Sequence, residues 1–221
     1  MSAKRLQKAA IATAASTAAV DELIAKIKNK DDKVRSEAWL GAGKVGAPAV
    51  KPLAATMSDE DFEVARAARR GLWQIVRHVG RPEADKEKRA VVGELIPLLR
   101  DNQPLLVRRE VLWMLSEIAD DESVKPVADL LSNKELREDA RMVLQRLPGK
   151  RSLAALEAGL KAAPQDFKIN IAESLRARGV EVRGIPPQKL APSRQTSVKP
   201  LETTPGEEPS KPSRRRKAKV Q

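Results

Sequence analysis

Four residues at short spacing carry the clearest chemical pattern in this sequence: Arg66, Arg69, Arg70 and Trp73. Guanidinium groups bind carboxylates and phosphates through paired hydrogen bonds, and an indole ring stacks on bases or on bound side chains. Residues spaced three or four apart lie on one side of an α-helix. The pattern predicts a basic-aromatic cluster that binds a partner, and the alternative is an ordinary solvated face of a surface helix.

Residues suited to catalysis or metal binding are scarce. The sequence has no cysteine, and His78 is its one histidine. A thiolate nucleophile, a zinc site with cysteine ligands and most histidine-based acid–base schemes are therefore excluded. No motif pairs a nucleophile with an oriented base. We therefore expect a protein that is not an enzyme and that binds neither a metal nor a cofactor.

The composition favours packed helices. Hydrophobic residues make up 41% of the 221 residues, yet the aromatics are only Phe 2, Trp 3 and Tyr 0, so the core must be built mostly from aliphatic side chains. Strands of a β-sandwich prefer aromatic and β-branched residues. No stretch approaches the roughly 18 apolar residues that a membrane-spanning helix needs. We expect a soluble, cytoplasmic, helical protein with no membrane span.

The positive charge is concentrated at the C-terminal end. Half of the net charge of +12 falls on residues 180–221, a segment that also holds 7 of the 15 prolines. Such a segment has too little apolar surface to offset its ordering entropy, so residues 181–221 are expected to form a disordered, Pro-rich basic tail. Its terminal cluster would attract nucleic acid or any other polyanion: Arg214, Arg215, Arg216, Lys217 and Lys219.

A repeated pattern organises the rest of the chain. Five copies, which start at residues 34, 64, 107, 136 and 167, place apolar residues at positions 1, 5, 8, 9 and 12. At 100° per residue these positions form one stripe of a helix, and a second apolar segment precedes each copy. The sequence therefore predicts an all-α protein, an α-solenoid of about five helical hairpins over residues 20–180. One interval is about a dozen residues longer than the others, which places an insertion near 81–89.

The ends of the predicted solenoid and of its helices have their own signals. Residues 1–19 are expected to form an N-terminal helix or capping segment, with a targeting segment as the alternative. A polar residue precedes four of the five second helices at the place where an N-cap satisfies free amides. The predicted N-caps are Asp32, Asp61, Asn133 and Asp166.

This pattern resembles a known family. The motif Val-Arg-x-x-Ala-x-x-(Ala/Gly)-Leu on the second helix, and prolines within the first helix at Pro52, Pro97 and Pro126, resemble HEAT repeats. They are especially similar to the short HEAT-like repeats of phycocyanobilin lyases. The resemblance covers about residues 20–180. It implies that the motif arginines form a stabilising ladder with acidic residues such as Asp32, although Ala65 and Lys168 replace the arginine in two copies. The implied ladder arginines are Arg35, Arg108 and Arg137.

Functional residues are expected opposite the buried stripe, at positions 3, 6, 7 and 10 of each copy. In such solenoids the second helices usually line the concave surface. These positions hold all three tryptophans, although Trp39 and Trp113 are also placed to fill seams between repeats. Leu112 and Ala172 fall on the same predicted outward side. The predicted partner-binding residues are Arg66, Arg69, Arg70, Trp73, Arg109, Trp113 and Arg141.

These observations favour a non-enzymatic interaction or scaffold module that binds a protein partner, expected to be acidic, on its concave face. The alternative is binding of nucleic acid or another polyanion through the arginine face and the basic tail. The resemblance also leaves open a HEAT-like DNA glycosylase or a bilin lyase. For a glycosylase, Glu138 and Glu173 are the only acids on the outward side.

Overall fold

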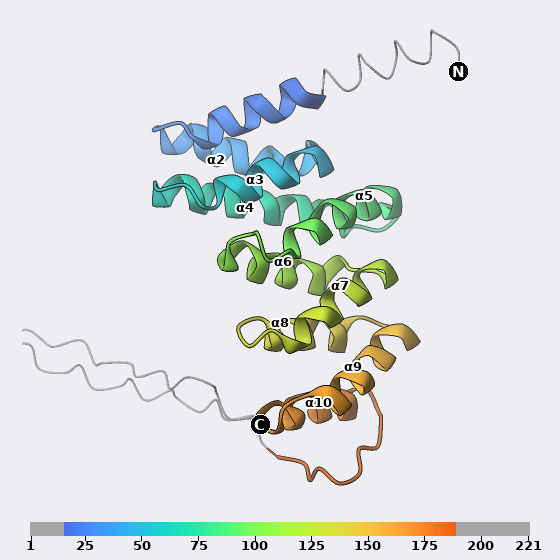
Figure 1. The fold of residues 1–221 in the computed structure, drawn as a ribbon. Helices are drawn as coiled ribbons and strands as arrows, with labels where there is room; N and C mark the ends of the chain where they lie inside the picture. The colour runs from blue at the N-terminus through green and yellow to red at the C-terminus, as the bar shows by residue number, and fades with distance from the viewer. Residues whose placement is uncertain (1–15, 189–221) are drawn as a thin grey trace, which may run out of the picture. The chain divides into compact units, whose positions relative to one another are not determined.

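The computed structural model describes residues 16–188, and all regular secondary structure in that range is helical. Five helical hairpins follow one another in chain order (Figure 1). The first helices of the hairpins are a helix over residues 16–27, α3 (Val50–Thr56), α5 (Asp85–Leu95), α7 (Val124–Ala128) and α9 (Lys150–Ala162). The second helices are α2 (Asp32–Gly41), α4 (Phe62–Val79), α6 (Leu105–Ile118), α8 (Arg137–Arg146) and α10 (Gln165–Ala177). The predicted α-solenoid is thereby confirmed.

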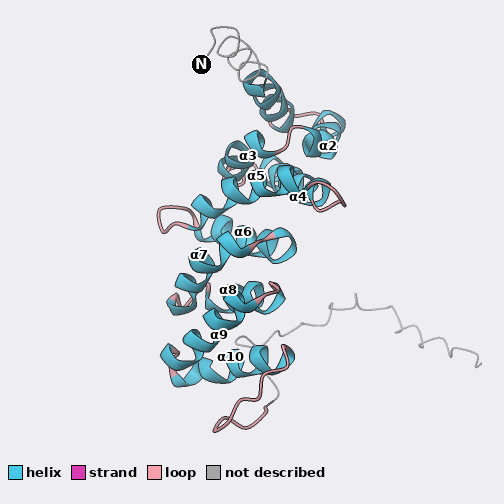
Figure 2. Cartoon of the chain, turned by 90° about the vertical axis from the view of Figure 1, so that its right-hand side faces the viewer, coloured by secondary structure: helices cyan, strands magenta, loops and turns pink. Residues whose placement is uncertain are grey.

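The hairpins stack so that like helices meet. Each second helix packs against the second helix of the next hairpin, from α2 through α4, α6 and α8 to α10. The second helices therefore form one layer and the first helices another, as Figure 2 shows from the side. Several first helices end in a 3-10 helix: η3 (Ile96–Leu99) follows α5, and η5 (Asp129–Ser132) follows α7.

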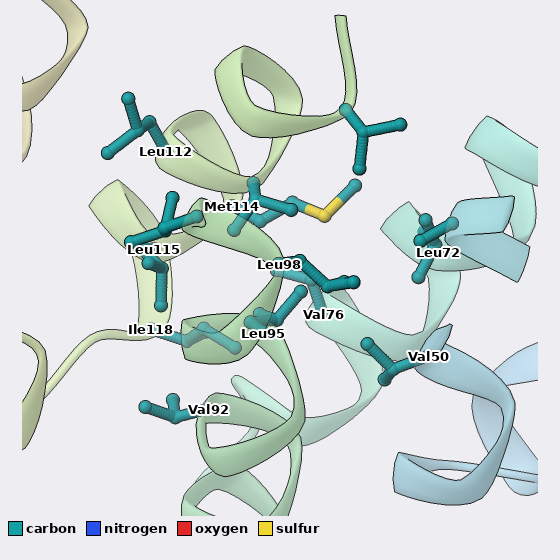
Figure 3. Close-up of a cluster of buried hydrophobic side chains, with 14 of the residues drawn as sticks. Val50, Leu72, Val76, Val92, Leu95, Leu98, Leu112, Met114, Leu115 and Ile118 are labelled. Carbon is teal, nitrogen blue, oxygen red and sulfur yellow. The ribbon is translucent and has the colours of Figure 1, made fainter. Parts of the chain in front are cut away.

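The core follows the predicted stripe. In α6, the residues at positions 1, 5, 8, 9 and 12 are all buried: Val107, Val111, Met114, Leu115 and Ile118. Figure 3 shows Met114, Leu115 and Ile118 of α6 beside apolar residues of the neighbouring elements, among them Leu95 of α5. Because one stripe is repeated from hairpin to hairpin, the buried side chains form a continuous cluster through the stack.

Of the four predicted N-caps, Asp61 is confirmed and the other three are wrong. Asp61 accepts hydrogen bonds from the amides of Glu63 (2.8 Å) and Val64 (3.3 Å). Asn133 accepts from the amides of Glu135 and Leu136 in the turn before α8, whose N-cap is Leu136. By contrast Asp32 is the first residue of α2, whose N-cap is its neighbour Asp31. Asp166 lies inside the first turn of α10. An N-cap carboxylate is occupied by the amides of its own helix. Because Asp166 is not the N-cap, its carboxylate can pair with a side chain of another helix.

The insertion near 81–89 becomes a short exposed loop and the first turns of α5. Arg81 bridges the two parts, since its guanidinium lies 2.8 Å from the Glu87 carboxylate and also donates to the His78 carbonyl. Glu83 in this loop has a φ of 65°, the only positive value at a non-glycine residue in the described range. The loop connects α4 to α5 and leaves the outward face of α4 uncovered.

Two of the sequence predictions fall partly beyond the described range. The N-terminal segment 1–19 enters it at residue 16, and the basic tail leaves it after residue 188. Within the range, residues 180–188 have no regular secondary structure, and Val180 and Val182 pack against the core. Arg176 of α10 donates hydrogen bonds to the carbonyls of Val182 and Ile185. None of the described helices is long and apolar enough to cross a membrane.

Candidate functional site

The outward face of α4 carries a stripe of cationic and aromatic side chains. Arg66, Arg70, Trp73 and Arg77 are spaced by four, three and four residues, which aligns them along one side of the helix. Together with neighbouring side chains they line a groove of about 630 Å³ between α2 and α4, which we call the arginine groove. Its lining residues are Trp39, Arg66, Arg69, Arg70, Trp73 and Arg77.

Two tryptophan rings and two guanidinium groups meet in this groove. The Arg70 guanidinium carbon lies 5.2 Å from the centre of the Trp39 ring, and that of Arg77 lies 5.9 Å from the centre of the Trp73 ring. Both distances are within the range of cation–π attraction. Both tryptophans are half-buried and pack against the core, so the rings are held in place and each exposes only part of its surface.

Glu110, a buried carboxylate of α6, fixes one side of the groove. It is only 4% exposed. Its Oε1 atom accepts hydrogen bonds from Trp73 Nε1 (2.5 Å) and from Arg69 Nε (2.7 Å). Arg69 is therefore neutralised by the next repeat. Glu110 was not among the residues predicted from the sequence. The available signal was its place at position 4 of the third copy, because the second copy carries Arg69 and Trp73.

The same arrangement recurs one repeat further along. Trp113 Nε1 donates to Asp139 Oδ1 at 2.8 Å, and Arg109 Nε lies 3.2 Å from Asp139 Oδ2. Asp139 occupies position 4 of its copy, as Glu110 does. Trp113 spans the seam between α6 and α8 through this contact while its side chain stays 42% exposed. In each case an acid of the following repeat holds an arginine and a tryptophan in place.

Arg141, the last predicted partner-binding residue, lies apart from the others and is occupied. Its guanidinium binds Glu138 (2.7 Å), Ser174 (2.6 Å) and Gln145 (3.0 Å), and only 15% of its side chain is exposed. The predicted outward placement of Leu112 and Ala172 is wrong, because both are fully buried. They share position 6 with Arg141, so this position faces the neighbouring second helix rather than solvent.

The ladder that the resemblance implies is present in altered form. Arg35 pairs with Asp32 at 3.2 Å, and Arg108 donates to the Leu99 carbonyl. Arg137 instead pairs with Asp166 of the next repeat at 2.6 Å. This hydrogen bond holds the pKa of the Asp166 carboxyl below its usual value.

Most arginines of the second helices are thus engaged by acids or carbonyls. On α4, Glu63 lies 2.5 Å from Arg66, and Glu110 binds Arg69. On α8 and α10, Arg146 pairs with Glu117, and Arg176 with Glu173. Across the second helices, all of which lie in the described range, two arginines have no acid or carbonyl partner: Arg70 and Arg77. The two arginines of the second helices that lack such a partner therefore both lie in the arginine groove.

Other features of the described residues offer little for catalysis or metal binding. No group of three or more potential ligand side chains converges within residues 16–188. His78 Nε2 lies 3.9 Å from the Glu87 carboxylate. Glu138 and Glu173, the acids that a glycosylase reading required, each pair with an arginine of their own helix.

The comparisons with known proteins agree with the repeat pattern of the sequence. A family model for HEAT repeats matches residues 50–148. No curated protein matches the chain. A designed armadillo repeat protein, solved in complex with the peptide (KR)4, is similar at 19% identity over 79% of this chain and 85% of that chain, with a TM-score of 0.42. An engineered protein is similar at 21% identity over 72% of this chain and 78% of that chain, with a TM-score of 0.38. The matched range of the family model includes α4, which supplies five of the six residues that line the groove.

Proposed function

We propose that this chain, which matches a family model for HEAT repeats over residues 50–148, is a non-enzymatic interaction module that binds an acidic protein partner on the face of its second helices. This face is the one that the sequence predicts to be concave. We place the binding site in the arginine groove and the protein in the cytoplasm.

The unpartnered pair of Arg70 and Arg77 carries this proposal. Every other arginine of the second helices has an acid or carbonyl within hydrogen-bonding distance, whereas the guanidinium groups of these two lie over the rings of Trp39 and Trp73. A carboxylate that enters the groove would form charge-assisted hydrogen bonds with them. The rings beside them add apolar contact area, and tryptophan and arginine are enriched among residues that dominate binding energy.

The distribution of charge favours a protein over nucleic acid as the partner. A nucleic-acid strand presents a phosphate at every nucleotide and is held by a continuous track of cations. Beyond α4 the arginines of the second helices are paired with acids or carbonyls, so they form no continuous track of unpaired cations. A short acidic segment matches two unpaired arginines better than a long polyanion does.

Charge reversal at the two arginines tests the proposal. Affinity capture from a cell extract, with the full-length protein as bait, should retain acidic proteins that the double variant Arg70→Glu, Arg77→Glu no longer retains. The matched control is Lys86→Glu, Arg89→Glu, which changes the net charge equally at two exposed residues of α5 that form no ion pair within the described residues. Both variants change surface side chains, so their unfolding free energies should stay within about 0.5 kcal/mol of the parent.

Two results would contradict the proposed function. If both double variants lose the same proteins, the capture depends on net charge and not on the groove. If neither loses them, the groove is a solvated surface. Retention of nucleic acid alone by the parent, lost on charge reversal at Arg70 and Arg77, would assign the groove to the alternative partner.

A further inference from the structure

The two unpaired arginines of the arginine groove lie seven residues apart on one helix. Arg70 and Arg77 both belong to α4, and both side chains are exposed. At a rise of about 1.5 Å per residue, their Cα atoms are about 10.5 Å apart along the helix axis. Seven residues make almost two full turns, so both arginines leave α4 on the same side. The groove thus offers two cations at a fixed spacing.

The walls of the groove beside these cations are mainly apolar. The rings of Trp39 and Trp73 and the methylene stems of the arginines supply them. Leu40, the residue after Trp39 on α2, is 57% exposed and adds an aliphatic side chain. The Arg70 guanidinium lies over the Trp39 ring, so Leu40 lies near the level of Arg70. A ligand in the groove therefore meets cations on α4 and apolar side chains on α2.

We propose that the acidic segment of the partner is an amphipathic α-helix that lies in the arginine groove along α4. This inference rests on the proposed function and specifies the form of its ligand. Two helices that lie side by side share one rise per residue, so carboxylates seven positions apart in the partner meet Arg70 and Arg77 together. Apolar residues three or four positions from each carboxylate lie beside it on the partner helix, and they cover Trp39 and Leu40.

A helix fits this arrangement better than an extended strand does. Side chains on one face of a strand repeat at about 6.6 Å, so neither one nor two such steps match a spacing of about 10.5 Å. A strand also turns alternate side chains to opposite faces, whereas a helix of about 10–12 Å in diameter presents side chains to both walls of a groove. Its apolar residues exclude water from the charged contacts, which strengthens their hydrogen bonds.

A peptide series tests the helix and its spacing. The reference is a fluorescein-labelled, acetylated peptide of about 20 residues in an Ala/Gln background, long enough to populate a helix in water. It carries two glutamates seven positions apart, each followed at the third and fourth positions by leucine. One relative moves the second glutamate two positions back, to another side of the helix. The other relative carries proline at a central alanine, which breaks the helix.

Fluorescence anisotropy with the full-length protein measures the affinities. The reference peptide should bind, and the peptide with the shifted glutamate should bind about tenfold more weakly, because one carboxylate misses its arginine. The proline peptide should also bind about tenfold more weakly or worse, since the break takes its second glutamate out of register. Circular dichroism of the free peptides checks that the reference and the shifted peptide are comparably helical.

Two leucines of matched exposure locate the apolar contact in the protein. Leu40→Ser should weaken binding of the reference peptide about tenfold, because it removes the aliphatic side chain beside Trp39. The matched control is Leu106→Ser, since Leu106 is 56% exposed and lies on α6, outside the groove. The control should leave the affinity unchanged. Both leucines are exposed, so neither change opens the core, and thermal melts check that both variants fold.

The outcomes separate this inference from the proposed function. Equal binding of the reference peptide and either relative, or equal effects of Leu40→Ser and Leu106→Ser, overturns the helix in the groove. If Arg70→Glu, Arg77→Glu abolishes binding in the same assay, acidic recognition by the groove remains. Binding that survives this charge reversal overturns both. No binding of the reference peptide at about 1 mM overturns the inference alone, and the affinity capture then decides the proposed function.

Discussion

At the scale of single residues, Glu110 shows how one carboxylate sets the charge of a surface. From the neighbouring helix α6, its carboxylate neutralises Arg69 and orients the Trp73 ring. It therefore determines which side chains of α4 remain available to a ligand. A buried carboxylate is costly unless it is hydrogen-bonded, and here both donors come from the preceding repeat. The same contact therefore links two repeats and sets the shape of the groove.

The first prediction concerns this contact. Glu110→Ala should lower the free energy of unfolding by about 1–3 kcal/mol, because it leaves the Trp73 indole N–H and the Arg69 guanidinium without their acceptor. Glu117→Ala, in the same helix, removes a half-exposed partner of Arg146 and should cost less than about 1 kcal/mol. Urea denaturation measures both. Equal losses would show that Glu110 contributes no more than a surface ion pair.

At the scale of elements, the packing of each helix depends on where small residues stand. Gly43, in the 3-10 helix η1 (Ala42–Lys44), lies against α4, where an added Cβ would come within 2.9 Å of the His78 Cβ and 3.2 Å of the Gln74 carbonyl. Gly93, inside α5, is exposed, and an added Cβ would meet no heavy atom within 4 Å. A side chain at Gly43 would therefore crowd α4, whereas a side chain at Gly93 would meet no other atoms.

The second prediction compares the two glycines. Gly93→Ala should stabilise the protein by about 0.5–1 kcal/mol, because alanine has the higher helix propensity and restricts the unfolded chain. Gly43→Ala should destabilise it, since η1 must move away from the backbone of α4. Thermal unfolding followed by circular dichroism checks both signs. A stabilising Gly43→Ala would mean that η1 and α4 do not approach this closely.

At the scale of the whole molecule, stability should come from the described stack and from the short segment that closes it. Val180 and Val182 pack against the core, and the hydrogen bonds from Arg176 hold the chain there as far as Ile185. The predicted boundary of the solenoid at residue 180 therefore lies within a segment that contacts α10. Residues from 189 onward contribute no apolar stripe in the sequence.

The third prediction separates these contributions. Removal of residues 189–221 should leave the thermal midpoint nearly unchanged, whereas removal of residues 180–221 should lower it through the lost contacts of Val180 and Val182. Leu144→Asp should be the most damaging change, because Leu144 is fully buried and an unpaired carboxylate there costs several kcal/mol. Circular-dichroism melts rank the three proteins. A melt in which removal of 189–221 costs more than Leu144→Asp would overturn the architecture.

The sequence by itself determined the elements and their order. An apolar stripe is a local signal with a period of 3.6 residues, and five agreeing copies make the hairpin repeat unambiguous. The local sequence also identified the N-cap Asp61, whereas the same signal failed at Asp32 and Asp166. Of the seven predicted partner-binding residues, the structure brings four together in one groove with Trp39 and Arg77: Arg66, Arg69, Arg70 and Trp73.

Only the tertiary structure decided which of those cations are available. The acids that neutralise Arg69, Arg109 and Arg137 lie on the next repeat, about thirty or more positions further along the chain. A helical wheel drawn for one helix contains no information about such partners, and for the same reason it placed the buried Leu112 outward. Side-chain pairing across a seam depends on how far two helices approach and which positions face each other. Those quantities arise from packing, and they leave Arg70 and Arg77 as the unpaired arginines of the second helices.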